Sequence, residues 1–398
     1  METKEYRTRT LFRAVDNHPI DGPVWPIGLD IGYSSTKTFS GNSVSCFPSF
    51  AIQDNDSYAV SFGDASIDEG NLLIRYKSET GTTWTVGAVA QNRISVDDTT
   101  AGSLDIYDRK RYNDPMFLVL ARTGIALGCQ TNEYGGPAGK RIIIETGLPP
   151  KYMTTDKKLL TNVLKGRHKF SISLAGGPWV DFDFTITDDD IDIIDQPRGT
   201  LFSVVMDKNF NFLPNAKDFL KSKILIFDPG FGTLDTVPVI ASVIDPDQCQ
   251  TYDNLGMKQV LANTCKEIAK RYNFEIPVPA VQQYLETGQV IQESEDGYSS
   301  NYVPFDDILA ACSKDICDKA IEKVMGVYNI PKNYKYFVIT GGTGAAWSSF
   351  IRGNKYFVHS NTVQIVSGNN GDPNYGYLMS NARGYYIWAY AKCRKANN

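Results

Sequence analysis

The stretch IGLDIGYSSTKTF, residues 27–39, ends an apolar run on an aspartate and then turns through a glycine and small hydroxyl residues to a lysine. The apolar residues predict a buried strand, and the Gly-Tyr-Ser-Ser segment predicts a tight turn into a second strand. Glycine lets a backbone approach an anion and aim N–H groups at it, and Ser and Thr hydroxyls add donors. We interpret the hairpin as a phosphate-binding turn, although a single Asp-Gly hairpin is also a common plain turn.

The same order of residues recurs about half a chain later. SKILIFDPGFGTLDTVPVI, residues 222–240, again runs from an apolar strand through an aspartate and a glycine turn into a strand. An aspartate can face a phosphate only if a cation lies between them, so Asp30 and Asp228 imply a Mg²⁺ ion held mainly through its waters. Lys37 would neutralise phosphate charge as a point cation.

A third glycine cluster, TGGTGAAW at residues 340–347, follows the apolar run YFVI. A strand that passes through glycines into a helix suits a close approach to the base or sugar of a nucleotide. An ordinary glycine turn is the alternative interpretation.

The bulk properties of the chain indicate its class. Its 398 residues predict two domains. A hydrophobic content of 42% indicates a globular protein, and a net charge of −5 argues against broad nonspecific DNA binding. No stretch approaches the roughly 20 apolar residues of a membrane span. The seven cysteines lack metal or redox spacing, and the N-terminus lacks an apolar signal core, so we expect a cytoplasmic protein.

The hydrophobic periodicity predicts several elements that organise the chain. Asp114 and Pro115 are expected to cap and begin a helix, and Cys312 and Cys317 are expected as core thiols of another helix. The polar stretches at 54–113 and 286–303 predict, respectively, a small insert and a loop.

Taken in order, the two Asp-X-Gly hairpins and the late strand–Gly-Gly turn resemble the actin-like ATPase superfamily. The segment ETGLPPKYMTTDKKLLTNVLKGRHKFSI at 145–172 and NARGYYIWA at 381–389 resemble the plasmid-segregating ParM type of bacterial and archaeal actin-like proteins. The resemblance implies an α/β fold with two domains, each with a smaller subdomain, around a cleft that binds ATP (or GTP) with Mg²⁺.

The expected domain boundaries follow from the resemblance and from the positions of the hairpins. They are an N-terminal extension at 1–26, domain I at 27–221 and 360–398 with an insert at about 51–113, and domain II at 222–359 with a smaller subdomain at about 256–304.

Site residues are carried over where the family motifs match this sequence. The resemblance implies a first phosphate loop, a second phosphate loop and an adenosine turn. These are, in order, Asp30, Gly32, Ser34, Ser35, Thr36 and Lys37; Asp228, Gly230, Gly232, Thr233 and Asp235; and Gly341, Gly342 and Thr343.

In such ATPases a Gln or Glu between the two loops orients the attacking water, and DIIDQPRGTLF at 192–202 places Gln196 there. A glutamine is no strong base, so it would align the water by hydrogen bonds. A surface turn before Pro197 is the alternative. Lys266 and Glu267 are base or ribose contacts by analogy with actin, and a solvated helix face is the alternative for them.

The function implied is a filament-forming ATPase whose partners are copies of itself. Its expected task is the segregation of plasmid or other replicon DNA through a DNA-binding adaptor, with no direct contact to nucleic acid or membrane. A small-molecule, sugar-type kinase of the same superfamily and a nucleotide-binding protein that does not polymerise remain as alternatives.

Two further features of the sequence are not assigned to chemistry. The histidines at 18, 168 and 359 are isolated, so a structural or exposed position is expected for each. DRKRY at 108–112 is a small basic cluster that we expect in a self-association contact or a solvated loop.

Overall fold

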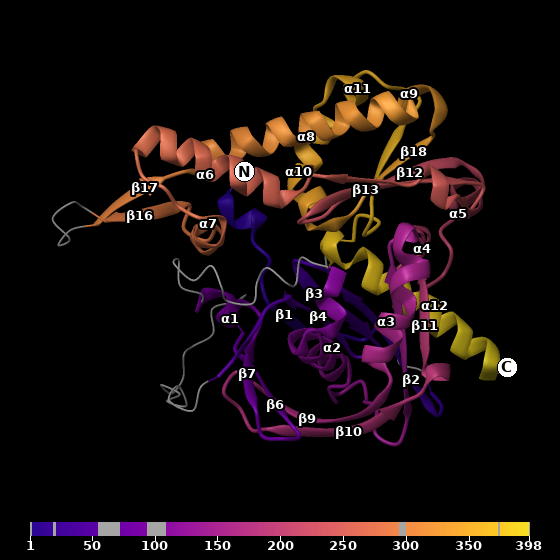
Figure 1. Cartoon of the computed structure of the whole chain (residues 1–398). Coiled ribbons are helices and arrows are strands. Elements are labelled where there is room, and N and C mark those ends of the chain that lie inside the picture. Colours follow the sequence, from indigo (N-terminus) through magenta and orange to yellow (C-terminus); the bar gives the residue numbers. More distant parts are fainter. Residues whose placement is uncertain are drawn as a thin grey trace. The chain divides into compact units, whose positions relative to one another are not determined.

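The computed structural model (Figure 1) forms two compact units from the chain. It describes residues 2–18, 21–54, 72–93, 109–293, 300–372 and 375–397. Of these described residues, the first unit takes in 8–18, 21–54, 72–93, 109–214 and 379–397, and the second unit takes in 2–7, 215–293, 300–372 and 375–378.

The first unit is built on a six-stranded sheet with the order β1-β4-β3-β2-β8-β11. Pairing is antiparallel from β1 to β2 and parallel between β2 and β8 and between β8 and β11. The strands are β1 Leu11–Ala14, β2 Val24–Ile31, β3 Ser35–Ser40, β4 Ser43–Pro48, β8 Arg141–Leu148 and β11 Ile191–Asp195.

Helices cover both faces of this sheet at its central strand β2. A Cβ on Gly28 would contact helix α12, whereas the side chain of the next residue, Leu29, contacts Gly124 of helix α2. Successive residues of a strand point to opposite faces, so α12 and α2 lie on opposite sides of the sheet. This explains why β2 is buried along almost its whole length. The helices of the unit are α1 Ala88–Asn92, α2 Pro115–Gly128, α3 Met153–Leu164, α4 Gln196–Val205 and α12 Ser380–Asn397.

The predicted start of helix α2 is confirmed. The side chain of Asp114 accepts a hydrogen bond from the backbone N–H of Met116 at 2.8 Å, and Pro115 is the first helical residue. The cap satisfies one of the N–H groups that the first turn leaves without a partner.

A second sheet in the first unit corrects the view of residues 54–113 as a polar insert. Its order is β10-β9-β6-β7-β5, so strands from that stretch pair with β9, far away in the sequence. Residues 55–71 and 94–108 of the expected insert lie outside the described residues. The strands are β5 Ala51–Gln53, β6 Ile74–Ser78, β7 Thr83–Val86, β9 Gly166–Leu174 and β10 Val180–Ile186.

The second unit is built on a mixed sheet with the order β14-β13-β12-β18-β19, and β15 also pairs with β13. β12, β18 and β19 are parallel, whereas β12 and β13 form an antiparallel hairpin. The strands are β12 Lys223–Pro229, β13 Thr233–Ile240, β14 Val243–Ile244, β15 Gln250–Asp253, β18 Tyr336–Ile339 and β19 Gln364–Ser367. The helices are α5 Ala216–Lys221, α6 Met257–Tyr272, α7 Val278–Tyr284, α8 Asp306–Tyr328, α9 Ile330–Asn333, α10 Gly341–Arg352 and α11 Lys355–Val358.

Two features of the second unit differ from the expectations. The stretch 286–303, expected as a loop, contributes a two-stranded sheet of β16 Gln289–Glu293 and β17 Ser300–Pro304, in which Val290 is fully buried. Strand β19 pairs with β18, so the second unit extends to Leu378, whereas we expected the chain to return to the first domain at residue 360.

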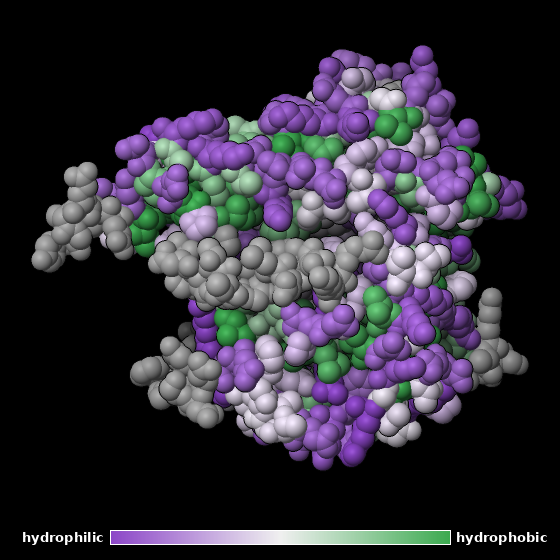
Figure 2. Space-filling model, in the orientation of Figure 1, coloured by the Kyte–Doolittle hydropathy of each residue, from purple (hydrophilic) through white to green (hydrophobic). Residues whose placement is uncertain are grey.

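Apolar side chains of both units are gathered inside. Cys312 and Cys317 are buried in α8, as predicted, and all seven cysteines are free thiols. On the face shown in Figure 2, hydrophilic residues predominate and apolar residues lie among them in small groups. Among the described residues, none of the helices has the length and apolar character needed to span a bilayer.

The buried histidine of the first unit makes a hydrogen bond through each of its ring nitrogens. His168 of β9 is 2% exposed, its Nε2 donates to the carbonyl of Leu164 at 2.8 Å, and its Nδ1 accepts from Nε of Arg122 at 3.2 Å. Burial lowers the pKa of His168 below its usual 6.5, and the charge of Arg122 acts in the same direction.

We therefore expect the first unit to lose stability as the pH falls below about 6.5, where the unfolded chain takes up a proton that the folded imidazole resists. Thermal unfolding at pH 7.5 and 5.5 measures this loss, and His168→Gln should reduce it because a glutamine does not titrate. An unchanged pH dependence in the variant would contradict this role of His168.

Candidate functional site

The carboxyl ends of three parallel strands place polar residues on one edge of the first unit's sheet. Gly28 of β2 is in register with Glu145 of β8, and β8 continues in register with β11 to its last residue, Asp195. Asp30 lies two residues beyond Gly28, and Gln196 follows β11 directly. With strands spaced at about 4.8 Å, β2 and β11 are roughly 10 Å apart, so Asp30 and Gln196 flank the end of β8. Ligands of open α/β sheets bind at such edges.

The first predicted carboxylate is paired with the predicted lysine. Asp30 and Lys37 are opposite residues of the β2–β3 hairpin, and Lys37 Nζ donates to Asp30 Oδ2 at 3.1 Å. Both side chains are about nine-tenths buried. The pair brings a charged donor and a charged acceptor to the strand end without leaving either charge isolated. Cys46 lies opposite Lys37 on β4, and burial raises the pKa of this thiol to about 11, so it stays protonated.

A serine that the sequence analysis missed, Ser49, binds the glycine turn of this hairpin. Ser49 Oγ donates to the carbonyl of Gly32 at 2.8 Å and lies 3.0 Å from the hydroxyl of Thr36, while its backbone N–H donates to the carbonyl of Ser34. Gly32 N–H closes the turn onto the carbonyl of Ser35 at 3.0 Å. Thr36 thus points into the unit, where its hydroxyl supports the turn.

A buried arginine beside the turn corrects our expectation for the basic cluster. The guanidinium of Arg111 lies 4.4 Å from the ring centroid of Tyr33, the residue after Gly32, and Arg111 is only 9% exposed. Arg111 is therefore neither solvated nor a surface contact, because it packs on three aromatic rings. Asp108 and the side chains of Arg109 and Lys110 lie outside the described residues. The aromatic Tyr112 directly after Arg111 is the only sequence signal in the cluster that points to such packing.

Gln196 begins helix α4 at the end of β11. It is the first helical residue, followed by a buried Pro197. Across this start, Arg198 Nε donates to Asp195 Oδ2 at 3.1 Å; Asp195 lies one residue before Gln196 and Arg198 two residues after it. The side chain of Gln196 is partly exposed at the sheet edge, so it can reach a bound molecule there. The alternative interpretation of Gln196 was a surface turn before Pro197; the structure has the start of a helix there.

The second unit repeats the arrangement at the carboxyl ends of β12 and β18. Phe227 is in register with Ile339, and Thr340 N–H donates to the carbonyl of Phe227 at 3.1 Å, so Asp228 and Gly341 are brought side by side. Gly341 has a φ of +77°, and a Cβ there would lie 2.6 Å from Asp228 Oδ1. Only glycine fits both the conformation and the space.

The turn after Asp228 is held between the starts of two helices. At the start of α6, the N–H of Met257 donates to the carbonyl of Gly230 at 3.1 Å, and the N–H of Lys258 donates to that of Phe231 at 2.8 Å. At the start of α10, Thr343 Oγ1 donates to the carbonyl of Gly230 at 3.1 Å. The carbonyls of the turn are thereby drawn toward the helices, and both helix starts carry positive dipole ends. An anion is favoured at such a place.

Two carboxylates of this hairpin lie on one face. Asp228 and Asp235 are opposite residues of β12 and β13, and side chains opposite each other in an antiparallel pair project to the same side. Asp235 accepts hydrogen bonds from Thr251 at 2.6 Å and from Thr233 at 3.2 Å. These oxygen ligands fit a Mg²⁺ ion. Nowhere in the described part of the chain do three His, Cys, Asp or Glu side chains form a metal site, so such an ion would complete its shell with water or phosphate.

Lys266 and Glu267 lie elsewhere in the second unit, in a hollow of about 640 Å³ between α6 and α8. Glu267 is bound by Lys270, one turn further along α6. The hollow is also lined by Cys312 and Asp315 of α8. Both predicted residues are exposed.

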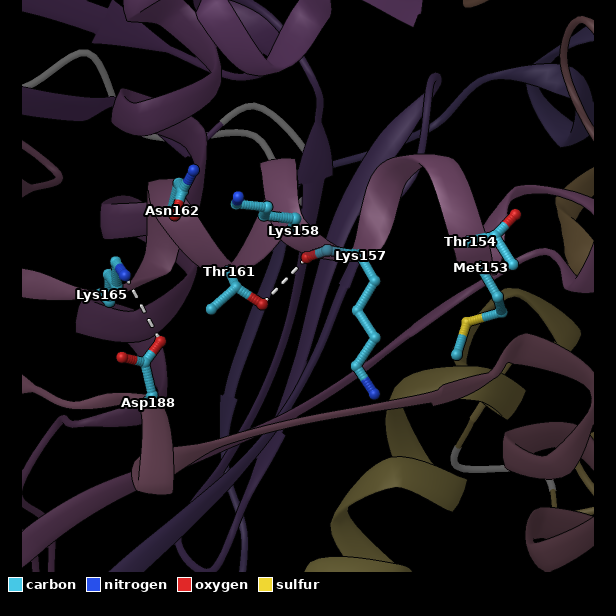
Figure 3. Close-up of a pocket in the computed structure, with 8 residues that line it drawn as sticks. All are labelled: Met153, Thr154, Lys157, Lys158, Thr161, Asn162, Lys165 and Asp188. Carbon is cyan, nitrogen blue, oxygen red and sulfur yellow. Dashed lines mark hydrogen bonds and ion pairs between the residues drawn. The ribbon is translucent and has the colours of Figure 1, made fainter.

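A hollow of about 590 Å³ on helix α3 contains none of the predicted site residues (Figure 3). Three lysines line it, and Figure 3 shows Lys165 turned toward Asp188, with Nζ 3.5 Å from the carboxylate. Lys157 reaches the carbonyl of Ile193 at 3.5 Å. Its lysines are exposed surface residues, so it does not form a defined site.

We predict that Gly341→Ala lowers the free energy of unfolding by at least about 1–2 kcal/mol, because alanine at positive φ is strained and its Cβ meets Asp228. Chemical denaturation measures the change. The matched control is Gly326→Ala, on the exposed side of α8 with open space around it, which should stabilise by roughly 0.5 kcal/mol. Equal stability of the two variants would contradict the close approach of Gly341 to Asp228.

Comparison with known proteins adds to this geometry. Residues 28–199 match the family model described as actin-like proteins N-terminal domain. None of the curated proteins matches the sequence.

Solved structures of actin-like proteins match almost the whole chain. A ParM filament from Clostridium botulinum, described as 15-stranded, shares 19% identity over 93% of this chain and 100% of that one, with a TM-score of 0.70. A non-polymerisable quadruple mutant of pCBH ParM shares 20% identity over 92% and 99%, with a TM-score of 0.67. The ADP complex of Ta0583, an archaeal actin homolog, shares 13% identity over 92% and 100%, with a TM-score of 0.61.

These matches confirm the predicted fold class. Residues 28–199 match the model of the actin-like N-terminal domain, and the chain as a whole has the actin-like fold.

Proposed function

We propose that the protein is a Mg²⁺-dependent ATPase that polymerises into filaments in the cytoplasm. The observation that carries the proposal is the repeated site geometry. In each unit an aspartate ends a strand at the carboxyl edge of parallel strands, beside a glycine turn that is held by hydrogen bonds from neighbouring elements. A homologue of the same fold is known as a complex with ADP.

In this proposal each residue has a stated role. The residues that follow Gly32 and Gly230 would offer backbone N–H groups to phosphate oxygens, because the N–H groups of the two glycines close their own turns. Asp228, with Asp235 beside it, would hold the waters of Mg²⁺, and the bound ion would neutralise charge on the phosphates. Lys37 places a cation at the first turn. Gln196 would orient the attacking water, since an amide can both accept and donate a hydrogen bond but is not a base.

Self-association is the second part of the proposal. Two of the structural relatives are described as filaments. We propose that nucleotide-bound copies of this chain assemble, that hydrolysis weakens their contacts, and that the filament moves plasmid or other replicon DNA through a small DNA-binding adaptor. The net charge of −5 supports an adaptor rather than direct DNA binding.

Purified protein tests this function directly. We expect sedimentation with ATP and Mg²⁺ but much less with ADP, together with phosphate release whose specific rate rises with protein concentration because assembly promotes hydrolysis. Electron microscopy of the pellet should show filaments. Phosphorylation of an added sugar without sedimentation would instead indicate a small-molecule kinase, and hydrolysis independent of protein concentration would indicate a nucleotide-binding protein that does not polymerise.

Two substitutions separate the proposed roles. Asp228→Ala should abolish Mg²⁺-dependent turnover, because the carboxylate that holds the hydrated ion is lost. Gln196→Ala should slow single-turnover hydrolysis by about 10- to 100-fold and leave nucleotide affinity nearly unchanged, because only the orientation of water is lost. Stopped-flow binding of a fluorescent ATP analogue and phosphate release measure the two quantities. Wild-type turnover in Asp228→Ala, or lost binding in Gln196→Ala, would rule out the assigned role.

A further inference from the structure

One short segment of helix α12 faces helix α4 within the first unit. Thr200 Oγ1 of α4 donates to Asn381 Oδ1 at 2.7 Å, and both residues are buried. At the next turn of the contact the helices touch through backbone, because a Cβ on Gly384 would lie 1.8 Å from the carbonyl oxygen of Gly199. No residue larger than glycine fits at Gly384 unless α4 moves.

Arg383, in the same segment, binds the carboxyl end of α4. Its side chain is 2% exposed. Nη1 donates to the carbonyl of Ser203 at 2.5 Å and to its hydroxyl at 3.2 Å, and Nη2 donates to the carbonyls of Met206 at 3.2 Å and Asp207 at 2.9 Å. The carbonyl of Ser203 is one that the helix end leaves without an intrahelical partner, and Met206 and Asp207 follow the helix directly. A cation there also complements the negative end of the helix dipole.

Tyr385 fixes α4 against the sheet edge that carries the predicted site. It is fully buried, and its ring lies against Gly199 while its hydroxyl lies against Gly147 of β8. A Cβ on Gly147 would be 2.1 Å from the tyrosine oxygen. The contact therefore links α4 to the carboxyl end of β8. Gly147 is next to Leu148, the residue of β8 that pairs with Asp195.

We propose that Asn381, Arg383, Gly384 and Tyr385, the α12 clamp, are positioning residues that set the location of Gln196 for hydrolysis. The inference rests on the proposed ATPase function. Helix α4 has ten residues and a length of about 15 Å, and the clamp holds it in its first turn and at its end. Gln196 is the first residue of helix α4, so a rotation or translation of the helix displaces the amide of Gln196 directly. A shift of about 1 Å at a reacting group can cost roughly 100-fold in rate.

Three variants weaken the clamp in different ways. Arg383→Lys keeps the charge but loses the fork that reaches several carbonyls, Thr200→Val removes one hydrogen bond at constant volume, and Gly384→Ala forces α4 away. In each we expect single-turnover hydrolysis to fall by about tenfold or more, with nucleotide affinity changed less than about threefold, because Gln196 acts on the rate and not on binding.

A matched control separates positioning from general loss of stability. Ile172 of β9 is buried in the five-stranded sheet of the same unit. Ile172→Ala should lower the thermal midpoint, yet leave the hydrolysis rate and the amide exchange of α4 at wild-type values. The clamp variants should speed amide exchange in α4, a readout that does not depend on catalysis.

A double-mutant cycle decides whether the clamp acts through Gln196. In the Gln196→Ala background, Arg383→Lys should slow hydrolysis by less than about twofold further, since the displaced group is already absent. Full additive slowing, or wild-type rates in folded Arg383→Lys and Thr200→Val, would overturn the inference. If Arg383→Lys does not fold, Thr200→Val takes its place in the cycle.

The two proposals can fail separately. No hydrolysis by the wild-type protein would refute the proposed function, whereas full activity of Gln196→Ala in a hydrolysing protein would refute the role of Gln196 and with it the clamp. Unchanged amide exchange of α4 in folded clamp variants would refute the clamp whether or not the wild-type protein hydrolyses ATP.

Discussion

The parallel pairing of strands is the constraint on which the rest of this molecule depends. In the first unit it aligns the ends of β2, β8 and β11, and in the second unit it aligns the ends of β12, β18 and β19. Parallel strands deliver their carboxyl ends to one edge, so residues that are distant in the sequence become neighbours there. For this reason Asp30 and Gln196 lie at the same edge of the first unit's sheet, and Asp228 and Gly341 lie at the same edge of the second unit's sheet.

Close contacts of helix α12 with the strands and with helix α4 then hold the elements at the edge of the first unit's sheet in place. Gly28 lets α12 lie directly on β2, since a Cβ there would come within 2.2 Å of the carbonyl of Ala382. Further along α12, Lys392 binds the buried carboxylate of Glu145 on β8 and that of Asp192 on β11. The helix is thus tied to α4 near its start and to two parallel strands near its end. Glu145 is fully buried, so Lys392 supplies the charge that compensates its carboxylate, and the loss of Lys392 would leave that carboxylate without it.

Charge at the two turns is handled differently. In the first unit Lys37 sits on Asp30, so the strand end carries nearly balanced charge. In the second unit Asp228 and Asp235 share one face, and threonine hydroxyls bind Asp235. Like charges opposite each other are destabilising in a hairpin unless a cation or hydrogen bonds offset them. The second turn therefore places two carboxylates on one face, whereas the first places a carboxylate beside a fixed cation.

The sequence by itself determined the two aspartate hairpins and the cap of α2, because these depend on hydrophobic period, turn chemistry and a local hydrogen bond at Asp114. The α/β class followed from the resemblance that those motifs carry. It could not assign residues 74–86 to a sheet with β9, since strands that pair with a distant partner carry no local signal of that partner. It also missed Ser49 beneath the first turn and Arg111 against Tyr33. The contacts of Arg383 with α4, nearly 180 positions away, exist only because tertiary packing brings a buried guanidinium to the open carbonyls of a helix end.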